Sequence, residues 1–262
     1  MDPVLHHTLP QARWMHPALA RLPGMLPVAP GDWLRVDEAF AGQMALRDDL
    51  ILHRPGDVLA LLPEGAAAAG ELLDRVLAEV ARMASYRVGA DAVVRPDGAS
   101  VPVDRSAPLA SAGRLVQCDL CLLERPPGAA EHRMTGAVLC FPASWTLAQK
   151  IGRPLTAIHD PVAEYGAGLA ARVQRLFDAL RPEAPLWRMN ALAYADPTLH
   201  QPRREGEARA PGPRRFLRSE RQCLVRLPRT GAVVFSIHTY VLPIDTLTEP
   251  ARQRFLAQGH GA

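Results

Sequence analysis

The chain has 262 residues, of which 48% are hydrophobic and 22% charged, and its formal net charge is +3. This composition is typical of an ordinary soluble globular protein, and no apolar run approaches the ~18 residues that a membrane-spanning helix needs. So small a net charge also argues against nucleic-acid binding, so we expect neither a membrane nor a nucleic acid as a partner.

The first 30 residues are rich in proline and histidine and show no regular period. We therefore predict an extended N-terminal arm over residues 1–30 that packs on the surface or is partly disordered. The segment lacks a basic start followed by an apolar core, so no signal peptide is expected. In such a chain the four cysteines favour reduced thiols and a cytoplasmic location.

Two helical segments are predicted within residues 31–85. In the first, Phe40, Met44 and Ile51 recur at roughly helical spacing, and Pro55 marks its end. The second carries a stronger apolar stripe, which comprises Leu72, Leu73, Val76, Leu77, Val80 and Met83. Residues 86–113 mix short apolar pieces with Pro, Gly, Asp and Ser, which predicts a loop with room for one short strand.

The next two apolar runs, 114–125 and 135–142, are short and predict a pair of strands joined as a hairpin. The first run contains Cys118 and Cys121, whose spacing occurs in metal and redox pairs. Residues three apart on a strand point to opposite faces, which opposes chelation, so we interpret both as buried strand cysteines.

A helical crossing is predicted after this hairpin. Thr146 and Gln149 have the spacing of a capping box, and Asp160 followed by Pro161 favours the start of a longer helix that ends near residue 181. His159 lies directly before that start. The positive end of a helix dipole disfavours a protonated imidazole, so His159 could keep a lone pair free for a metal. A solvated loop histidine is the plainer interpretation.

Three more strands are predicted at the C-terminal end. Residues 185–197 form the first, a polar arginine-rich loop follows over 201–215, and two alternating runs flank the turn 228–231. Runs of helix and strand, without strict alternation, predict an α+β fold with an antiparallel sheet. Glycine-rich phosphate loops and the common hydrolase motifs are absent.

Polar side chains recur on these last strands. Strand alternation places them in four groups, Arg218 with Glu220 and Gln222, Ser219 with Arg221 and Cys223, Arg188 with Asn190, and Ser236 with His238 and Tyr240. Buried charges need partners, so these faces are either solvent-exposed or, if they meet, the polar wall of a ligand pocket.

Several segments resemble one known family. They read GDWLRVDEAFAGQMALR, RLVQCDLCLL, LCFPASWTLAQKIGRPLTAIHDPV, LWRMNALAYADPTLHQP and FLRSERQCLVRLPRTGAVVFSIHTYVLP. In this order, over residues 31–243, they are similar to the haem-dependent oxidative N-demethylase α-subunit family. The resemblance implies a single haem-binding domain over 31–262, in which a PAS-like antiparallel sheet with crossing helices carries added N-terminal helices (31–85).

The implied activity is oxygen-dependent removal of a methyl group from a small secondary amine such as dimethylamine, with release of formaldehyde. The implied cofactor is one haem b per chain, and electrons would come from NADPH through a partner reductase carrying flavin and an iron–sulfur centre. This chain has no flavin or iron–sulfur signature of its own, which fits a subunit that needs such a partner.

The resemblance also implies roles for single residues. In haem-binding PAS domains the iron ligand is typically a histidine on or near the long crossing helix, and His159 holds that place, with His238 as a rival ligand. The implied contacts to substrate and oxygen are Glu220, Arg188 and His238, and those to the cofactor are Arg218 and Arg221. A carboxylate suits an alkylammonium ion, and a guanidinium suits bound oxygen or a haem propionate.

Two other classes of function stay open at this point. One is a haem-binding gas sensor without turnover, and the other is a haem-free PAS-like module that binds a small ligand.

Overall fold

The computed structural model describes residues 4–20, 24–143, 145–159, 167–208 and 211–260. Its strands are β1 (Leu26–Pro27), β2 (Leu59–Leu61), β3 (Arg87–Val88), β4 (Ala92–Val94), β5 (Ser100–Pro102), β6 (Asp119–Glu124), β7 (Arg133–Val138), β8 (Leu186–Met189), β9 (Leu192–Tyr194), β10 (Phe216–Arg226) and β11 (Val233–Pro243). The large sheet is antiparallel, in the order β1-β8-β10-β11-β6-β7-β2, and β9 also pairs with β10. Strands β3, β4 and β5 form a separate small sheet.

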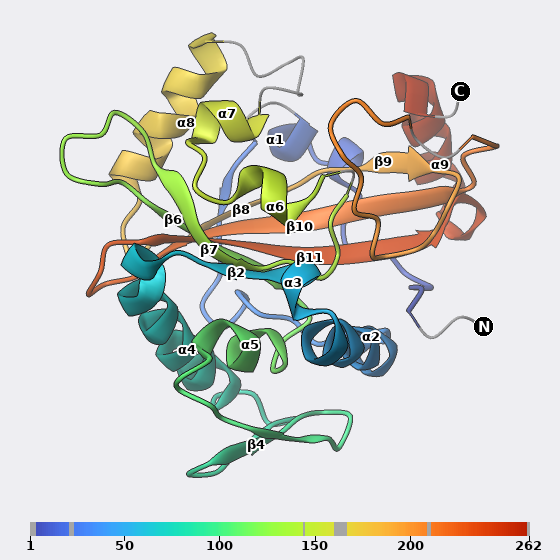
Figure 1. Ribbon diagram of the computed structural model, residues 1–262. Helices are drawn as coiled ribbons and strands as arrows, with labels where there is room; N and C mark the ends of the chain where they lie inside the picture. Colours follow the sequence, from blue (N-terminus) through green and yellow to red (C-terminus); the bar gives the residue numbers. More distant parts are fainter. Residues whose placement is uncertain (1–3, 21–23, 144, 160–166, 209–210, 261–262) are drawn as a thin grey trace.

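Helices cover both faces of the large sheet (Figure 1). One side carries α2 (Phe40–His53), α3 (Pro55–Val58), α4 (Ala66–Val80) and α5 (Pro108–Gly113), and the other carries α6 (Leu147–Lys150), α7 (Leu155–His159) and α8 (Ala167–Ala179). The N-terminal segment holds η1 (Arg13–Met15) and α1 (Pro17–Ala20), and η2 (Pro63–Gly65) precedes α4. The C-terminal elements are η3 (Ile244–Thr246), α9 (Glu249–Phe255) and a π-helical turn, η4 (Leu256–His260).

The β10–β11 hairpin is the centre of the large sheet. Its register runs from Phe216 opposite Pro243 to Arg226 opposite Val233. Gly231 closes the turn with φ of 73°, a backbone conformation that favours glycine, and the guanidinium of Arg226 donates to the carbonyl O of Gly231 over 2.8 Å. This long hairpin fixes which polar side chains share a face.

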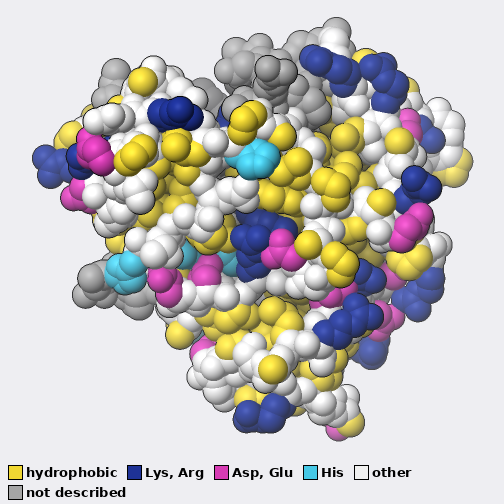
Figure 2. Space-filling model, turned by 180° about the vertical axis from the view of Figure 1, so that it is seen from behind, with side chains coloured by type: hydrophobic (Ala, Val, Ile, Leu, Met, Phe, Trp, Pro, Cys, Tyr) yellow, Lys and Arg dark blue, Asp and Glu magenta, His cyan; other side chains and the backbone are white. Residues whose placement is uncertain are grey.

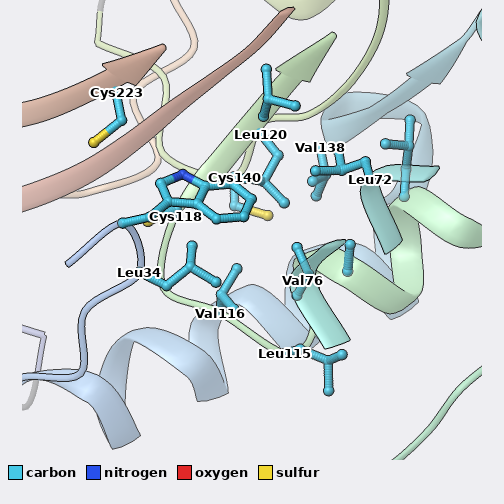
Figure 3. Close-up of a cluster of buried hydrophobic side chains, with 14 of the residues drawn as sticks. Leu34, Leu72, Val76, Leu115, Val116, Cys118, Leu120, Val138, Cys140 and Cys223 are labelled. Carbon is cyan, nitrogen blue, oxygen red and sulfur yellow. The ribbon is translucent and has the colours of Figure 1, made fainter. Parts of the chain in front are cut away.

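The main hydrophobic core fills the space between the sheet and the α2, α4 and α5 helices. Leu72 and Val76 of α4 pack there with Leu120 of β6 and Val138 of β7, all fully buried (Figure 3). The apolar stripe predicted from Leu72 to Met83 therefore faces the sheet, as an amphipathic helix requires. Burying a leucine or valine side chain in this way contributes roughly 1.5–3 kcal/mol before the entropic cost of ordering it.

A charged pair is enclosed in the same region. Arg47 of α2 donates to Asp119 of β6 over 2.6 Å, and both side chains are 0% exposed. Asp119 also accepts the backbone N–H groups of Cys140 and Phe141, at 2.8 and 2.9 Å. The pair therefore joins α2 to the β6–β7 hairpin and to the segment that leaves it.

The structure confirms the α+β class and the antiparallel sheet. The predicted helices are found as α2 and α4, the predicted first hairpin as β6 and β7, and the last hairpin as β10 and β11. Their chain order is also as expected, because a helical segment, α6 to α8, separates β6–β7 from β8, β10 and β11. The Asp160-Pro161 helix start lies outside the described residues.

Three segments differ from the predictions. Residues 86–113 are not mainly loop but contain the small β3–β4–β5 sheet and α5. The single strand expected over 185–197 is divided into β8 and β9. The N-terminal arm is not simply extended, because it contains η1 and α1, and β1 pairs with β8 at the edge of the large sheet. Short strands of two to four residues carry too little alternation to be recognised from a sequence.

The two local motifs have different outcomes. Thr146 precedes α6, but its hydroxyl contacts the side-chain oxygen of Gln149 at 2.7 Å and makes no capping bond to the backbone. Cys118 and Cys121 are both buried and belong to different hydrophobic clusters, so they do not form a chelating pair. Cys118 precedes β6, because the strand begins at Asp119.

None of the helices within the described residues is long and apolar enough to cross a membrane. On the face shown in Figure 2, Lys and Arg side chains alternate with Asp and Glu side chains and form no single continuous basic area. This distribution agrees with the low net charge of the chain.

Candidate functional site

Buried polar side chains gather on the sheet face that α6 and α7 cover. Ile237 of β11 packs with Leu147 of α6 and Ile158 of α7, so it marks this face. Gln222 stands opposite both Ile237 and Arg188 in the register, and paired residues of neighbouring strands share a face. Alternation then adds Glu220 and Arg218 to the same face. We call this the α6–α8 face.

A carboxylate held by two amides lies at the centre of this group. Asn190, which lies between β8 and β9, donates through Nδ2 to Glu220 Oε2 over 2.7 Å, and Gln222 Nε2 donates to the same oxygen over 2.9 Å. The backbone N–H of Glu220 donates in turn to Asn190 Oδ1 over 2.8 Å. Glu220 is only 7% exposed. Oε2 is thus saturated, and Oε1 is the oxygen left for a further donor.

Arg218 lies beside this carboxylate. Its Nη1 and Nη2 donate to the carbonyl oxygens of Leu199 and Phe141, over 3.1 and 2.6 Å. Its Nε is 3.6 Å from Glu220 Oε1 and has no hydrogen-bond partner among the described residues. The guanidinium therefore fixes two loop segments against β10 and places its charge next to Glu220.

Arg188 is less well satisfied. Its Nε is buried and has no hydrogen-bond partner in the described part of the chain, and the same holds for Thr239 Oγ1, whose residue is opposite Glu220. Burial lowers the pKa of the Arg188 guanidinium, the positive charge of Arg13 lowers it further, and Glu220 opposes both. Buried polar atoms without partners are rare in native proteins and call for a missing ligand or water.

The end of α7 is fixed by the only lysine of the chain. Lys150 is buried, and its Nζ donates to the carbonyl O of Ile158 over 2.7 Å and pairs with Glu205. Ile158 directly precedes His159, the last residue of α7. The side chain of His159 lies outside the described residues, so its direction stays a prediction.

The opposite face of the sheet holds a different polar cluster. Asp37 Oδ2 lies 3.0 Å from His6 Nε2 and 2.7 Å from His238 Nε2, and Gln117 donates to Asp37 Oδ1 over 2.8 Å. Burial opposes ionisation of Asp37, but the hydrogen bonds of His238 and His6 outweigh it and hold its pKa well below the ordinary value. Burial also lowers the pKa of His238, so its imidazole is neutral near pH 7.

The ligand atoms of His6, Asp37 and His238 lie within 4.8 Å of one another, a spacing that a metal ion could bridge. However, His6 Nδ1 accepts the backbone N–H of Val241 over 3.3 Å, so the neutral ring carries its proton on Nε2. Nδ1 of His238 lies 3.7 Å from the Cys118 thiol, whose pKa burial raises to about 12. Each ring can thus donate to Asp37, and the cluster is satisfied as a hydrogen-bonded triad.

Arg221 belongs to this second face as well. It stands opposite His238 in the register, and its guanidinium donates to the carbonyl oxygens of Asp32 and Trp33 and to Asp32 Oδ2, at 2.7, 3.1 and 3.1 Å. The guanidinium also stacks over the Trp187 ring, with 5.1 Å to its centroid. Arg221 therefore ties the segment after the N-terminal arm to the sheet.

A match to a known protein family decides which family the chain belongs to. The chain matches the family described as "Haem-dependent oxidative N-demethylase, alpha subunit-like" over residues 24–260. The chain belongs to this family. Membership indicates a haem-dependent oxidative function of the N-demethylase kind, and the words "alpha subunit" indicate an assembly with other subunits.

The haem that the family name implies would have to bind on one of the two faces of the sheet. Haem carries two propionates and needs an axial ligand and a large apolar contact. The α6–α8 face fits the polar contacts of this group, because Arg188, Arg218 and Thr239 have side-chain atoms without hydrogen-bond partners among the described residues and Arg188 has no ion pair there. The opposite face fits less well, because Arg47 and Arg221 already have the carboxylate partners Asp119 and Asp32.

The residues singled out by sequence are thus divided between two faces. Arg188, Arg218 and Glu220 share the α6–α8 face with the helix that ends at His159, whereas Arg221 and His238 lie on the other side of the sheet. The single polar wall that we considered does not form, because a strand directs neighbouring side chains to opposite faces. Sequence reasoning also missed His6 and Asp37, since no spacing links such distant positions to His238 on β11.

Proposed function

We propose that the chain is the haem-binding subunit of an oxidative N-demethylase. It binds one haem b between the large sheet and α6–α8, and acts on a small secondary amine such as dimethylamine with release of formaldehyde. In this proposal the sheet and its crossing helices are a haem-binding PAS-like domain. The observation that carries the proposal is the buried Glu220, held by Asn190 and Gln222 among donors that lack partners.

His159 is proposed as the axial ligand of the haem iron. It ends α7 on the correct side of the sheet, and Lys150 holds the carbonyl of the preceding residue. His238 is the weaker candidate, because both of its ring nitrogens already face partners on the opposite side of the sheet. When bound, haem would supply the oxygen and electron chemistry, which the side chains of the protein cannot supply themselves.

Glu220 is proposed to bind the amine. A dialkylammonium ion carries N–H donors and a positive charge, and a buried carboxylate accepts such a donor in a charge-assisted hydrogen bond. Because Oε2 already accepts two amide N–H groups, the ammonium binds at Oε1, which can also take up its proton. Asn190 and Gln222 fix the carboxylate plane and so the orientation of the methyl groups.

The reaction requires a partner. Release of a methyl group as formaldehyde consumes dioxygen, electrons and protons, and it returns the demethylated amine and water. We propose that the electrons come from NADPH through a reductase that carries flavin and an iron–sulfur centre. The α-subunit description of the family supports an assembly of this kind.

The proposal is tested by titrating haem into the purified chain and recording the visible spectrum. We expect a Soret band of a histidine-ligated haem that His159→Ala abolishes or shifts, whereas the exposed His53→Ala leaves it unchanged. Formaldehyde release is then measured with secondary and tertiary amines and a reductase, and Glu220→Gln should weaken amine binding about tenfold or more. Absence of a Soret band in the wild type rejects the proposal. A haem spectrum without formaldehyde from any amine favours the gas sensor.

A further inference from the structure

A polar cavity of about 290 Å³ lies beside α8 at one end of the large sheet. The charged or titratable side chains of its lining are Glu124, Arg125, His132, Asp178 and Arg226. Val233 of β11 stands opposite both Arg226 and Leu123 in the register, so β6 and β10 end side by side here. Arg226 is six positions along β10 from Glu220, roughly 20 Å at the rise of a strand. The cavity is therefore separate from the proposed amine site.

Two opposite charges in this lining have no ion pair. The Glu124 carboxylate accepts the Thr135 hydroxyl at Oε2, but Oε1 has no hydrogen bond and the group meets no cation among the described residues. The terminal nitrogens of Arg226 donate to backbone carbonyl oxygens over 2.8 and 2.7 Å, and its Nε has no partner in the described part of the chain. By contrast, Arg125 and Asp178 pair with each other over 2.9 Å.

His132 adds a neutral donor to the same cavity. Gln174 Oε1 accepts the backbone N–H of His132 over 3.3 Å, so its Nε2 is the amide donor and lies 3.0 Å from His132 Nδ1. The same Nε2 donates to Asp178 Oδ1 over 2.9 Å. His132 Nδ1 is thus an acceptor, and the ring carries its proton on Nε2. Burial lowers the pKa of His132, so the ring is neutral near pH 7. Its Nε2–H is left for a ligand.

We propose that this cavity binds a small zwitterion of the amino-acid type. Glu124 accepts the ammonium group, and Arg226 and His132 Nε2–H donate to the carboxylate. The charges of the lining favour such a ligand, because its two carboxylates and two guanidinium groups sum to zero. A zwitterion supplies a partner to each unpaired charge, through charge-assisted hydrogen bonds, and leaves the sum unchanged. A lone cation or anion would supply only one of the two partners.

The size of the cavity agrees with this ligand. Pockets for drug-sized molecules begin at about 300 Å³, so a cavity at this lower limit suits a molecule with few heavy atoms. The site lies far from Glu220, so we expect amino-acid binding to be the same with and without added haem.

The test screens the twenty common amino acids against the purified full-length chain by thermal shift and measures the affinity of the best binder by calorimetry. Methylammonium chloride and sodium acetate, which each carry one half of the zwitterion, are titrated in parallel. At least one amino acid should bind saturably and raise the melting temperature. Each half-ligand should bind about tenfold more weakly or worse.

Two substitutions tie this binding to the cavity, with circular dichroism as a check on folding. Glu124→Gln keeps an oxygen for the Thr135 hydroxyl but removes the charge, so it should weaken binding about tenfold or more. His132→Asn keeps an acceptor for Gln174 but removes the Nε2–H, and should weaken binding about threefold or more. Glu183→Gln is the control, because the Glu183 side chain is 69% exposed and outside the cavity.

Three results would overturn the inference. They are no binding of any amino acid, binding that both cavity substitutions leave unchanged, and equal affinity for an amino acid and one of its halves. Competition between the amino acid and haem would also place the ligand elsewhere. The titrations need no haem, so their outcome is independent of whether the proposed function stands.

Discussion

The two faces of the large sheet differ in whether their guanidinium groups have carboxylate partners. On the face covered by α2, α4 and α5, the main buried guanidinium groups each have a carboxylate partner. Arg47 pairs with Asp119 and Arg221 with Asp32, and the neutral His238 is hydrogen-bonded to Asp37. On the α6–α8 face, Arg218 lies 3.6 Å from Glu220, but Arg188 has no ion pair among the described residues. Atoms without hydrogen-bond partners occur on both faces, at Arg47 and Arg221 on the first and at Arg188, Arg218 and Thr239 on the second. The guanidinium without a carboxylate partner therefore distinguishes the α6–α8 face and indicates a place for a ligand.

The largest expected effect comes from breaking the Arg47–Asp119 pair on the face that α2, α4 and α5 cover. Arg47→Met leaves Asp119 buried without its counter-ion, which costs about 3–5 kcal/mol in the free energy of unfolding. Urea denaturation followed by circular dichroism measures it. Arg54→Met is the control, because the Arg54–Asp57 pair is half exposed and its loss costs less than about 1 kcal/mol. Equal costs for the two variants would contradict the enclosed nature of the first pair.

The His6–Asp37–His238 cluster predicts that stability falls in acid. The pKa of His238 is lower in the folded than in the unfolded chain, so the unfolded chain binds more protons below about pH 6.5. The pKa of Asp37 is lowered too, so its contribution is present above about pH 3.9 and is lost as the pH falls further. Both effects favour the folded state at neutral pH.

We therefore expect the free energy of unfolding to decrease from pH 7 to pH 5, by at most about 1.4 kcal/mol per pH unit for a single titrating histidine. His238→Gln should reduce this slope. Chemical denaturation at a series of pH values measures it, with the exposed His53→Gln as the control. A slope that stays unchanged in His238→Gln would place the acid sensitivity elsewhere.

The sequence predicted local order better than contacts between distant segments. Strand alternation assigned Arg218, Glu220 and Gln222 to one face of β10, and the register confirms this. It could not tell which other strand supplies the same face, because that depends on pairings between residues far apart in the chain. Asn190 shows the limit, since its side chain bonds to Glu220 at the point where the expected strand is interrupted.

The N-terminal region shows the same limit. Its prolines and histidines predict an extended arm, whereas the described residues of this region contain η1, α1 and β1. His6 is nevertheless 2% exposed, because Asp37 and the backbone of Val241 satisfy both of its ring nitrogens. These partners are 31 and 235 positions away in the chain, so only the folded arrangement reveals them.

The smallest expected effect compares two hydroxyl groups on β11. Ser236 points to the face that α2, α4 and α5 cover, where its Oγ accepts the indole N–H of Trp33 over 2.9 Å. Ser236→Ala should therefore lower the free energy of unfolding by about 1 kcal/mol. Thr239 points to the α6–α8 face with Oγ1 unpartnered among the described residues, so Thr239→Val should leave the haem-free chain equally stable or up to about 1 kcal/mol more stable. Thermal or urea unfolding measures both. A clear loss of stability in Thr239→Val would mean that the hydroxyl already has a partner in the fold, and the contrast between the two faces would then rest on the charges alone.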